Sequence, residues 1–294
     1  MFIKNNNAKE ILTPFFFGQS IFLIVNACTS QPESSGLLNI GVINYEGGAE
    51  IINQYARFKR YLGERTRAKI ILEPTFNENK AIERLESRAW SLVFAPPGLA
   101  AIAISRYQYI PIFPLVGLTN LRCVLITRED SAIRTLQDLQ GKTVALGQLG
   151  SATGYYLPLY NLYGLTLAEV LSAPTPKTVM EWVAEGKAIA GAVSMAEFNL
   201  YNSQFQDNKL RIFYTDPHYV PPGVVLIQST IESKRQEYIR KVMSEFPSAS
   251  AQEVGYIPNA RIPNYQYMIS VVERVQPIAA QLQNQPVQLF NKTI

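Results

Sequence analysis

From residue 37 onward, short apolar runs alternate with segments in which apolar positions recur every three to four residues. The run Leu92–Ala95 is entirely apolar and a Pro-Pro-Gly turn follows it, which is typical of a buried strand. Between 49 and 62 the apolar spacing is that of an amphipathic helix packed against such strands. We expect strands at 38–43, 69–72 and 92–95, and helices at 49–62 and 78–87. Strands that alternate with helices predict βαβ units around a parallel sheet.

The same alternation resumes after a stretch rich in proline and glycine at 110–121. Residues 122–223 are predicted to form a second lobe, inserted into a first lobe made of 37–121 and 224–294. Two apolar runs, 122–127 and 224–228, are expected to be paired hinge strands. The other expected strands are 141–147, 189–193 and 211–214, and the other expected helices are 135–139, one that ends near 162, 178–185 and 231–246. A chain that crosses twice between lobes leaves a cleft that can close on a ligand.

The N-terminal pattern differs from the rest of the chain. The apolar run 11–25 is too short and interrupted for a membrane span of about 20 residues, and it has the length of a signal-peptide core. It ends in Ala27 and Cys28 and resembles a bacterial lipoprotein signal, which implies that 1–27 is removed and Cys28 is lipidated. The polar residues 28–36 would then be a flexible tether. The alternative is an uncleaved anchor helix in which Cys28 is incidental.

Composition and charge exclude several classes of function. The 27 basic and 23 acidic side chains are spread along the chain without a dense Lys/Arg block, so nucleic-acid binding is not supported. Two cysteines, Cys28 and Cys123, and one histidine, His218, are too few for a zinc or iron–sulfur site. Nucleophilic catalysis would have to use His218 alone. Cys123 lies in an apolar run and is predicted to be a buried thiol.

The stretch 147–156 carries the most informative chemistry. It follows a predicted strand and opens a helix, and Ser151 and Thr153 place two hydroxyls at the helix start. The first amides of a helix have no intrahelical acceptor, and the helix dipole favours negative charge there. Small residues at 150, 152 and 154 allow an anion to approach the backbone. An N-capping turn with nothing bound is the alternative. The Lys of a P-loop and the GxGxxG spacing are absent, so nucleotide binding is disfavoured.

Three stretches, 138–145, 150–155 and 183–193, resemble the periplasmic phosphonate-binding proteins of ABC transporters. The resemblance covers about 38–250 and implies an α/β, two-lobed type II periplasmic-binding fold with the ligand between the lobes. The family's Ser-Thr-Ser-Gly anion loop is similar to residues 151–154 here. The resemblance therefore implies ligand-binding roles for Ser151, Ala152, Thr153, Gly154 and Tyr155.

Other ligand contacts follow from the resemblance with less support from the residues. Glu197 comes shortly after the strand 189–193, and Tyr45 lies in the loop after the first strand, where the family has ligand contacts. A histidine often found before the 178–185 helix is absent, and Lys177 offers a positive charge instead. Because Glu197 is the one carboxylate candidate for an ammonium group, an oxyanion-like ligand is favoured over an aminoalkyl phosphonate. His218 is a ligand candidate or an ordinary loop histidine.

Three further features favour packing or solvation. Trp90 and Trp182 are predicted to be packing residues. The cations between Arg57 and Lys69 form a loose basic patch. A solvated face is its default interpretation, with docking on anionic lipid or a permease as the alternative. The tyrosines of the C-terminal segment are expected to pack.

The resemblance implies a solute-binding protein rather than an enzyme. We expect a monomeric, extracytoplasmic lipoprotein that captures a phosphonate- or phosphate-like oxyanion for an ABC permease, without a cofactor or a bound metal. The alternative is a ligand-sensing or interaction protein that uses the same fold without transport. An enzyme is disfavoured because no nucleophile–base pair or metal cluster is visible in the sequence.

Overall fold

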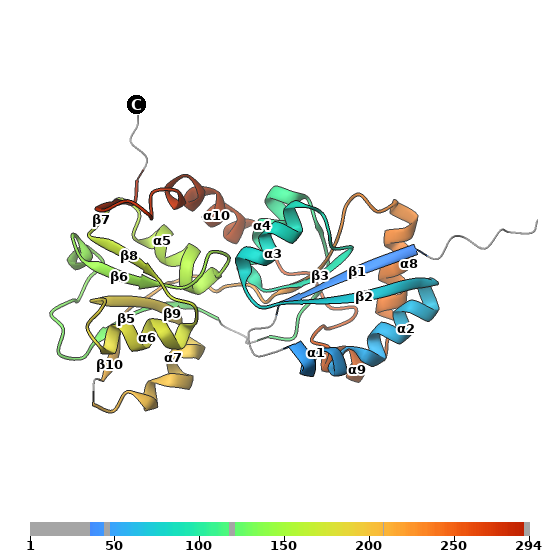
Figure 1. The fold of residues 1–294 in the computed structure, drawn as a ribbon, viewed down its shortest axis with the longest axis horizontal. Helices are drawn as coiled ribbons and strands as arrows, with labels where there is room; N and C mark the ends of the chain where they lie inside the picture. Colours follow the sequence, from blue (N-terminus) through green and yellow to red (C-terminus); the bar gives the residue numbers. More distant parts are fainter. Residues whose placement is uncertain (1–35, 44–47, 118–120, 208, 291–294) are drawn as a thin grey trace, which may run out of the picture. The chain divides into compact units, whose positions relative to one another are not determined.

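A computed structural model describes residues 36–43, 48–117, 121–207 and 209–290 (Figure 1). The predicted signal segment 1–27, nearly all of the tether, Cys28 and Tyr45 lie outside the described residues. The described chain forms two five-stranded sheets and one two-stranded sheet. The expected α/β fold with two lobes is therefore confirmed.

The first sheet has the strand order β2-β1-β3-β11-β4. Its parallel part is made of β1, β2 and β3, as the βαβ pattern predicts, whereas β11 runs antiparallel to both β3 and β4. The strands are β1 (Gly36–Ile43), β2 (Ala68–Thr75), β3 (Leu92–Ala95), β4 (Ile110–Pro114) and β11 (Val224–Ile227). The predicted strand at 92–95 is thus confirmed to the residue.

Helices cover both faces of this sheet. Alternate residues of β3 face opposite sides of the sheet. Leu92 and Phe94 pack into one apolar cluster, and Val93 and Ala95 pack into another. One face carries α1 (Gly48–Gln54), α2 (Ala56–Thr66), α8 (Ser233–Ser244) and α9 (Ser248–Glu253), and the other carries α3 (Glu78–Glu86) and α4 (Pro97–Tyr107) (Figure 1).

The expected helix at 49–62 is two helices that meet at Tyr55. This side chain is buried, and its hydroxyl donates to the carbonyl of Val254 at 2.7 Å. The Tyr55 ring also contacts the rings of Phe58 and Phe94 edge-on. The junction between α1 and α2 is therefore tied to α9 and to the sheet by one residue.

The second sheet has the order β10-β5-β9-β6-β8. Its strands are β5 (Cys123–Arg128), β6 (Thr143–Leu146), β8 (Glu169–Ser172), β9 (Ala190–Ser194) and β10 (Leu210–Thr215). β6 is parallel to β8 and β9, and β5 is antiparallel to β9 and β10. Apolar side chains of α6 (Pro176–Ala184) and α7 (Met195–Tyr201) pack on one face, and those of the π-helix η2 (Ala152–Tyr156), α5 (Leu157–Asn161) and α10 (Gln266–Ala279) pack on the other.

The hinge differs from its prediction. The two predicted crossover strands, β5 and β11, each lie within a sheet of their own lobe rather than between the lobes. The chain crosses between the sheets at 115–122, of which 118–120 lie outside the described part, and at 216–223. Strand pairing is a long-range property that the apolar runs do not encode. The crossing segments, rather than the strands, are where a hinge would bend.

The C-terminal segment also departs from the expected first lobe of 37–121 and 224–294. β12 (Val287–Gln288) pairs antiparallel with β7 (Thr166–Leu167) beside the second sheet. α10 contacts α4 of the first lobe and α5 of the second. Its buried side chains recur at helical spacing: Met268, Val271, Val272, Val275 and Ile278. The apolar face of α10 is therefore buried against both lobes.

One apolar cluster joins the two lobes. It contains Leu99 and Ile102 of α4, Leu125 and Leu146 of the second sheet, and Val271 of α10. Trp90 lies in the same cluster with no exposed surface, which confirms its predicted packing role. None of the helices in the described part of the chain is long and apolar enough to cross a membrane.

Candidate anion-binding site

The predicted anion loop lies where β6 ends and η2 begins. Ser151 is the N-cap of η2, and its Oγ accepts a hydrogen bond from the Gly154 amide at 3.0 Å. The first turn is π-helical, with the Tyr156 amide donating to the Ser151 carbonyl at 3.0 Å. Pro158 explains this departure from an α-helix, because it has no N–H for the Gly154 carbonyl. That carbonyl instead accepts from the Gly147 amide at 2.8 Å, which closes the loop.

Two backbone amides of the loop are not used by its own helix. Ser151 supplies acceptors for residues 154–156, so the amides of Ala152 and Thr153 remain without an intrahelical partner. Thr153 is 6% exposed and Tyr155 7% exposed. Burial raises the pKa of the Tyr155 phenol to about 12, so it stays neutral and can donate a hydrogen bond. The predicted residues 151–155 are therefore adjacent and largely buried.

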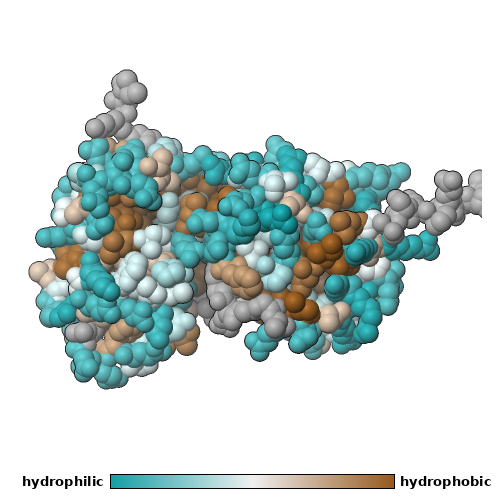
Figure 2. All heavy atoms as spheres, viewed as in Figure 1, coloured by the Kyte–Doolittle hydropathy of each residue, from teal (hydrophilic) through white to brown (hydrophobic). Residues whose placement is uncertain are grey.

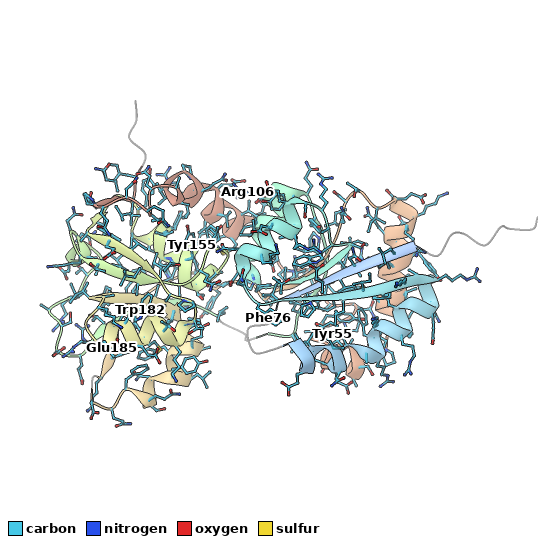
Figure 3. The ribbon with its side chains drawn as sticks, in the orientation of Figure 1. Tyr55, Phe76, Arg106, Tyr155, Trp182 and Glu185 are labelled. Carbon is cyan, nitrogen blue, oxygen red and sulfur yellow. The ribbon has the colours of Figure 1, made fainter. Side chains whose placement is uncertain are left out.

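The first lobe contributes two more helix starts at this point. A Cβ placed on Gly98, in the first turn of α4, would lie 2.0 Å from the Gly150 carbonyl oxygen and 2.7 Å from the Ala152 nitrogen. A Cβ placed on Gly150, whose φ is +108°, would lie 2.4 Å from Cβ of Glu78, the first residue of α3. The starts of α3, α4 and η2 therefore meet. Figure 3 shows Tyr155 on the part of its lobe nearest α4.

The electrostatics of this meeting favour an anion. Each helix start carries a partial positive charge. α4 begins after Pro96, which has no side-chain cap, so its first amides also lack a side-chain acceptor from the N-cap residue. Glu78 is 5% exposed, and its carboxylate already places one negative charge at the start of α3, so the favourable partial charges left for a ligand are those of α4 and η2. The sequence analysis missed Glu78 and Gly98, although Pro-Pro-Gly after a strand is a recognisable helix start.

Arg122 is a third residue that was not predicted from the sequence. It directly precedes β5, and its carbonyl accepts from the Met195 amide at 2.9 Å, which places it at the edge of the sheet where β9 ends. Its guanidinium carbon lies 4.1 Å from the centre of the Tyr219 ring. Its Nε is buried, with no hydrogen-bond partner among the described residues. A cation with an unused donor at this edge fits an anionic ligand.

Glu197 and Lys177 lie at the starts of helices α7 and α6. Glu197 forms a capping box, in which its Oε2 accepts from the Ser194 amide at 2.7 Å and its own amide donates to Ser194 Oγ at 3.1 Å. Lys177 is half exposed and lies 4.0 Å from the Glu181 carboxylate. Their described contacts thus serve their own helices.

His218 lies in the second crossing segment. Its ring stacks on Tyr267 of α10 with centroids 4.1 Å apart, and its Nδ1 is 3.1 Å from Asp216 Oδ1. Asp216 has no exposed surface, and its other oxygen accepts from Asn161 Nδ2 at 2.6 Å. These contacts join the segment to α5 and α10, and none of them involves the loop 151–155.

A pocket of about 280 Å³ lies beside the start of α4, at the carboxyl ends of β1 and β3. Its lining is mostly apolar and consists of Val42, Ile43, Ile51, Gln54, Tyr55, Phe94, Pro96, Leu115, Val116, Val254 and Gly255. Ligands of α/β proteins bind outside the carboxyl ends of the strands. The pocket therefore offers space for a non-polar part of a ligand.

The described residues offer little redox or metal chemistry. No group of three or more His, Cys, Asp or Glu within them could hold a metal ion. Cys123 is fully buried, as predicted, and burial raises the pKa of its thiol.

Comparison with known proteins decides the family. A family model described as "ABC transporter, phosphonate, periplasmic substrate-binding protein" matches residues 40–256. The chain belongs to this family. Its members are periplasmic solute-binding proteins that work with ABC transporters, and the resemblance seen in the sequence is confirmed.

Solved structures support the fold. A Xanthomonas citri protein bound to chloride ion is 20% identical, with a TM-score of 0.68 over 83% of this chain and 99% of that one. PhnD1 from Prochlorococcus marinus, in complex with methylphosphonate, is 16% identical, with a TM-score of 0.59 over 82% and 99%. A binding protein component of an ABC phosphonate transporter from Pseudomonas aeruginosa is 13% identical, with a TM-score of 0.59 over 84% and 88%.

Proposed function

We propose that this chain is a lipoprotein that captures a phosphonate- or phosphate-like oxyanion at the loop 151–155 and presents it to an ABC importer. The observation that carries the proposal is the meeting of the starts of α4 and η2 at Gly98 and Gly150. Two adjoining partial positive charges favour negative charge beside them; the Glu78 carboxylate supplies one such charge at α3, and a bound oxyanion would supply another at α4 and η2. Arg122 adds a full charge and an unused donor at the edge of the second sheet.

The ligand is proposed to make hydrogen bonds with Ser151, Thr153 and the amides of residues 152 and 153. The solved relatives support an anion, since one is bound to chloride and another to methylphosphonate. Tyr45, Glu197, Lys177 and His218 stay predicted contacts.

The decisive experiment removes the two hydroxyls. Each hydrogen bond to a charged group contributes roughly 1.5–3 kcal/mol, which is about 10- to 150-fold in affinity. Ser151→Ala with Thr153→Val is expected to weaken binding of methylphosphonate or phosphate at least about 100-fold by calorimetry. The loss of the Ser151 cap costs only about 1 kcal/mol of stability, so the fold persists.

A matched control is Ser131→Ala with Thr135→Val. Ser131 Oγ accepts from the Ile133 amide at 3.2 Å, a short-range role like that of Ser151. This control is expected to bind as the unmodified protein does. An affinity change below about threefold in the loop variant would place the anion elsewhere.

The lipid anchor is tested separately. Cys28→Ser is expected to leave an unprocessed precursor or to release the protein from membranes. Metabolic labelling with a fatty acid and membrane fractionation are the measurements. Normal processing and unchanged membrane association of the variant would contradict the anchor but would leave the ligand proposal intact.

A further inference from the structure

The chain's positive charge is concentrated on two packed helices. Residues 56–69, which comprise α2 and the start of β2, contain six cations and one carboxylate. Residues 232–245, which comprise α8 and its flanks, contain four cations and three carboxylates. Together they carry +6, whereas the whole chain carries +4, so the remainder is slightly negative. α2 and α8 contact each other. A net charge this uneven is the electrostatic footprint of an anionic partner.

Most of these cations have no structural role in the described part of the chain. Arg65 pairs with Glu245. Arg235 donates to the Thr66 carbonyl at 2.8 Å and thereby closes the end of α2. The others are exposed and have no ion pair among the described residues; we call them the basic surface: Arg57, Lys59, Arg60, Arg67, Lys69, Lys234, Arg240 and Lys241. Figure 2 shows hydrophilic residues over α2, which lies at the lower right of Figure 1.

One end of the basic surface, at Lys69 and Lys234, lies near the point where the described chain begins. β1 starts at Gly36, which pairs with Ala68, and the next residue of β1 pairs with Lys69. A Cβ on Gly36 would lie 3.7 Å from Arg235 Nη2 of α8. Residues 28–35, which lead back to Cys28, reach about 28 Å at full extension. A lipid anchor at Cys28 would therefore keep this end of the protein within a short distance of a membrane.

The anion site lies at the other end of the same strands. β1 and β2 are parallel, so their amino ends lie together at the basic surface. The starts of α3 and α4 follow the carboxyl ends of β2 and β3. A strand of eight residues spans about 26 Å. Docking through the end of the basic surface near Gly36 would leave the anion site free for ligand and for a transporter.

We infer that the basic surface docks on anionic phospholipid headgroups. The inference goes beyond the proposed ligand capture and uses none of its residues. A basic side chain near an anionic membrane surface strengthens binding about fivefold. A short tether to the same membrane would keep the basic surface at high local concentration, so weak contacts suffice. The solvated face that the sequence predicts by default does not account for eight exposed cations on two packed helices and the strand that follows one of them.

The test uses the full chain and vesicles of phosphatidylcholine with or without 30% phosphatidylglycerol. The variant is Lys59→Gln, Lys69→Gln and Lys234→Gln together. The matched control is Lys142→Gln, Lys187→Gln and Lys209→Gln, which removes the same charge from exposed positions of the second lobe. The unmodified protein, the variant and the control all contain the apolar N-terminal run, so its contribution to binding cancels when they are compared.

On vesicles with phosphatidylglycerol, the variant is expected to bind about 100-fold more weakly than the control in co-sedimentation, and the difference should disappear in 0.5 M salt. Equal binding of variant and control would overturn the inference. Equal vesicle binding together with lost transport by the variant in cells would assign the surface to a protein partner and would also overturn it. Thermal stabilisation by methylphosphonate should be the same in all three proteins, which separates this test from that of the proposed function.

Discussion

Gly98→Ala tests whether the two lobes meet at the anion loop. Gly98 lies in the first turn of α4, and an added Cβ would sit 2.0 Å from the Gly150 carbonyl oxygen. The second neighbour, at 2.7 Å, is the Ala152 nitrogen. Both are backbone atoms, so no side chain can rotate away. Either α4 or the loop must move by about 1 Å to restore an ordinary contact.

The magnitude follows from two opposing effects. Alanine in place of glycine inside a helix stabilises by roughly 0.5–1 kcal/mol. Overpacking against a fixed backbone costs typically 1–3 kcal/mol. We expect a net loss of about 1–2 kcal/mol in the free energy of unfolding. A displacement of about 1 Å also exceeds the tolerance of the amide hydrogen bonds, so oxyanion affinity should fall at least about 100-fold.

Urea denaturation followed by circular dichroism measures the first effect, and calorimetry with methylphosphonate measures the second. Gly117→Ala is the control, because the nearest atom to its added Cβ is 3.9 Å away, an ordinary contact. The control should match the unmodified protein or be slightly more stable. Unchanged stability and affinity of Gly98→Ala would refute the contact between α4 and the loop, and with it the site's geometry.

Three further outcomes are expected. Arg122→Gln should weaken oxyanion binding about 10- to 150-fold by calorimetry, with partial recovery in Arg122→Lys, and an unchanged affinity would remove Arg122 from the site. Cys123, which is fully buried and whose thiol pKa is raised by burial, should react with a thiol reagent only after denaturant unfolds the chain; rapid reaction in buffer would contradict its burial. Burial raises the pKa of Tyr109 and Tyr155 to about 12, so their stabilising contribution is complete below pH 10 and is lost as pH rises from 10 toward 12, by about 3 kcal/mol each. Tyrosinate absorbance and circular dichroism should therefore change together in that interval, and early ionisation with the fold intact would count against this explanation.

Much of the secondary structure could be predicted from apolar spacing, and the exceptions have physical causes. α4 escaped prediction because Leu99 to Ala103 are all buried, so the helix has no polar face to reveal its period. η2 is π-helical because Pro158 withholds an amide, which is a matter of one hydrogen bond rather than of periodicity. The pairing of β5 with β9 and of β11 with β3 depends on contacts distant in sequence.

The candidate site likewise contains some residues that the sequence predicts and others that it does not. Residues 151–155 form a local motif, in which small residues and hydroxyls directly follow a strand, so they can be identified from the sequence alone. Three other residues are at least 29 residues from that motif in the sequence: Glu78, Gly98 and Arg122. Only the fold brings Glu78 and Gly98 against the loop and places Arg122 at the end of β9 in the same sheet. Each is ordinary in its local sequence: an acidic helix start, a turn glycine, and a cation before a strand. In the proposed site the loop would supply the anion's hydrogen bonds, and the fold would add the start of α4 at Gly98 and the Arg122 guanidinium.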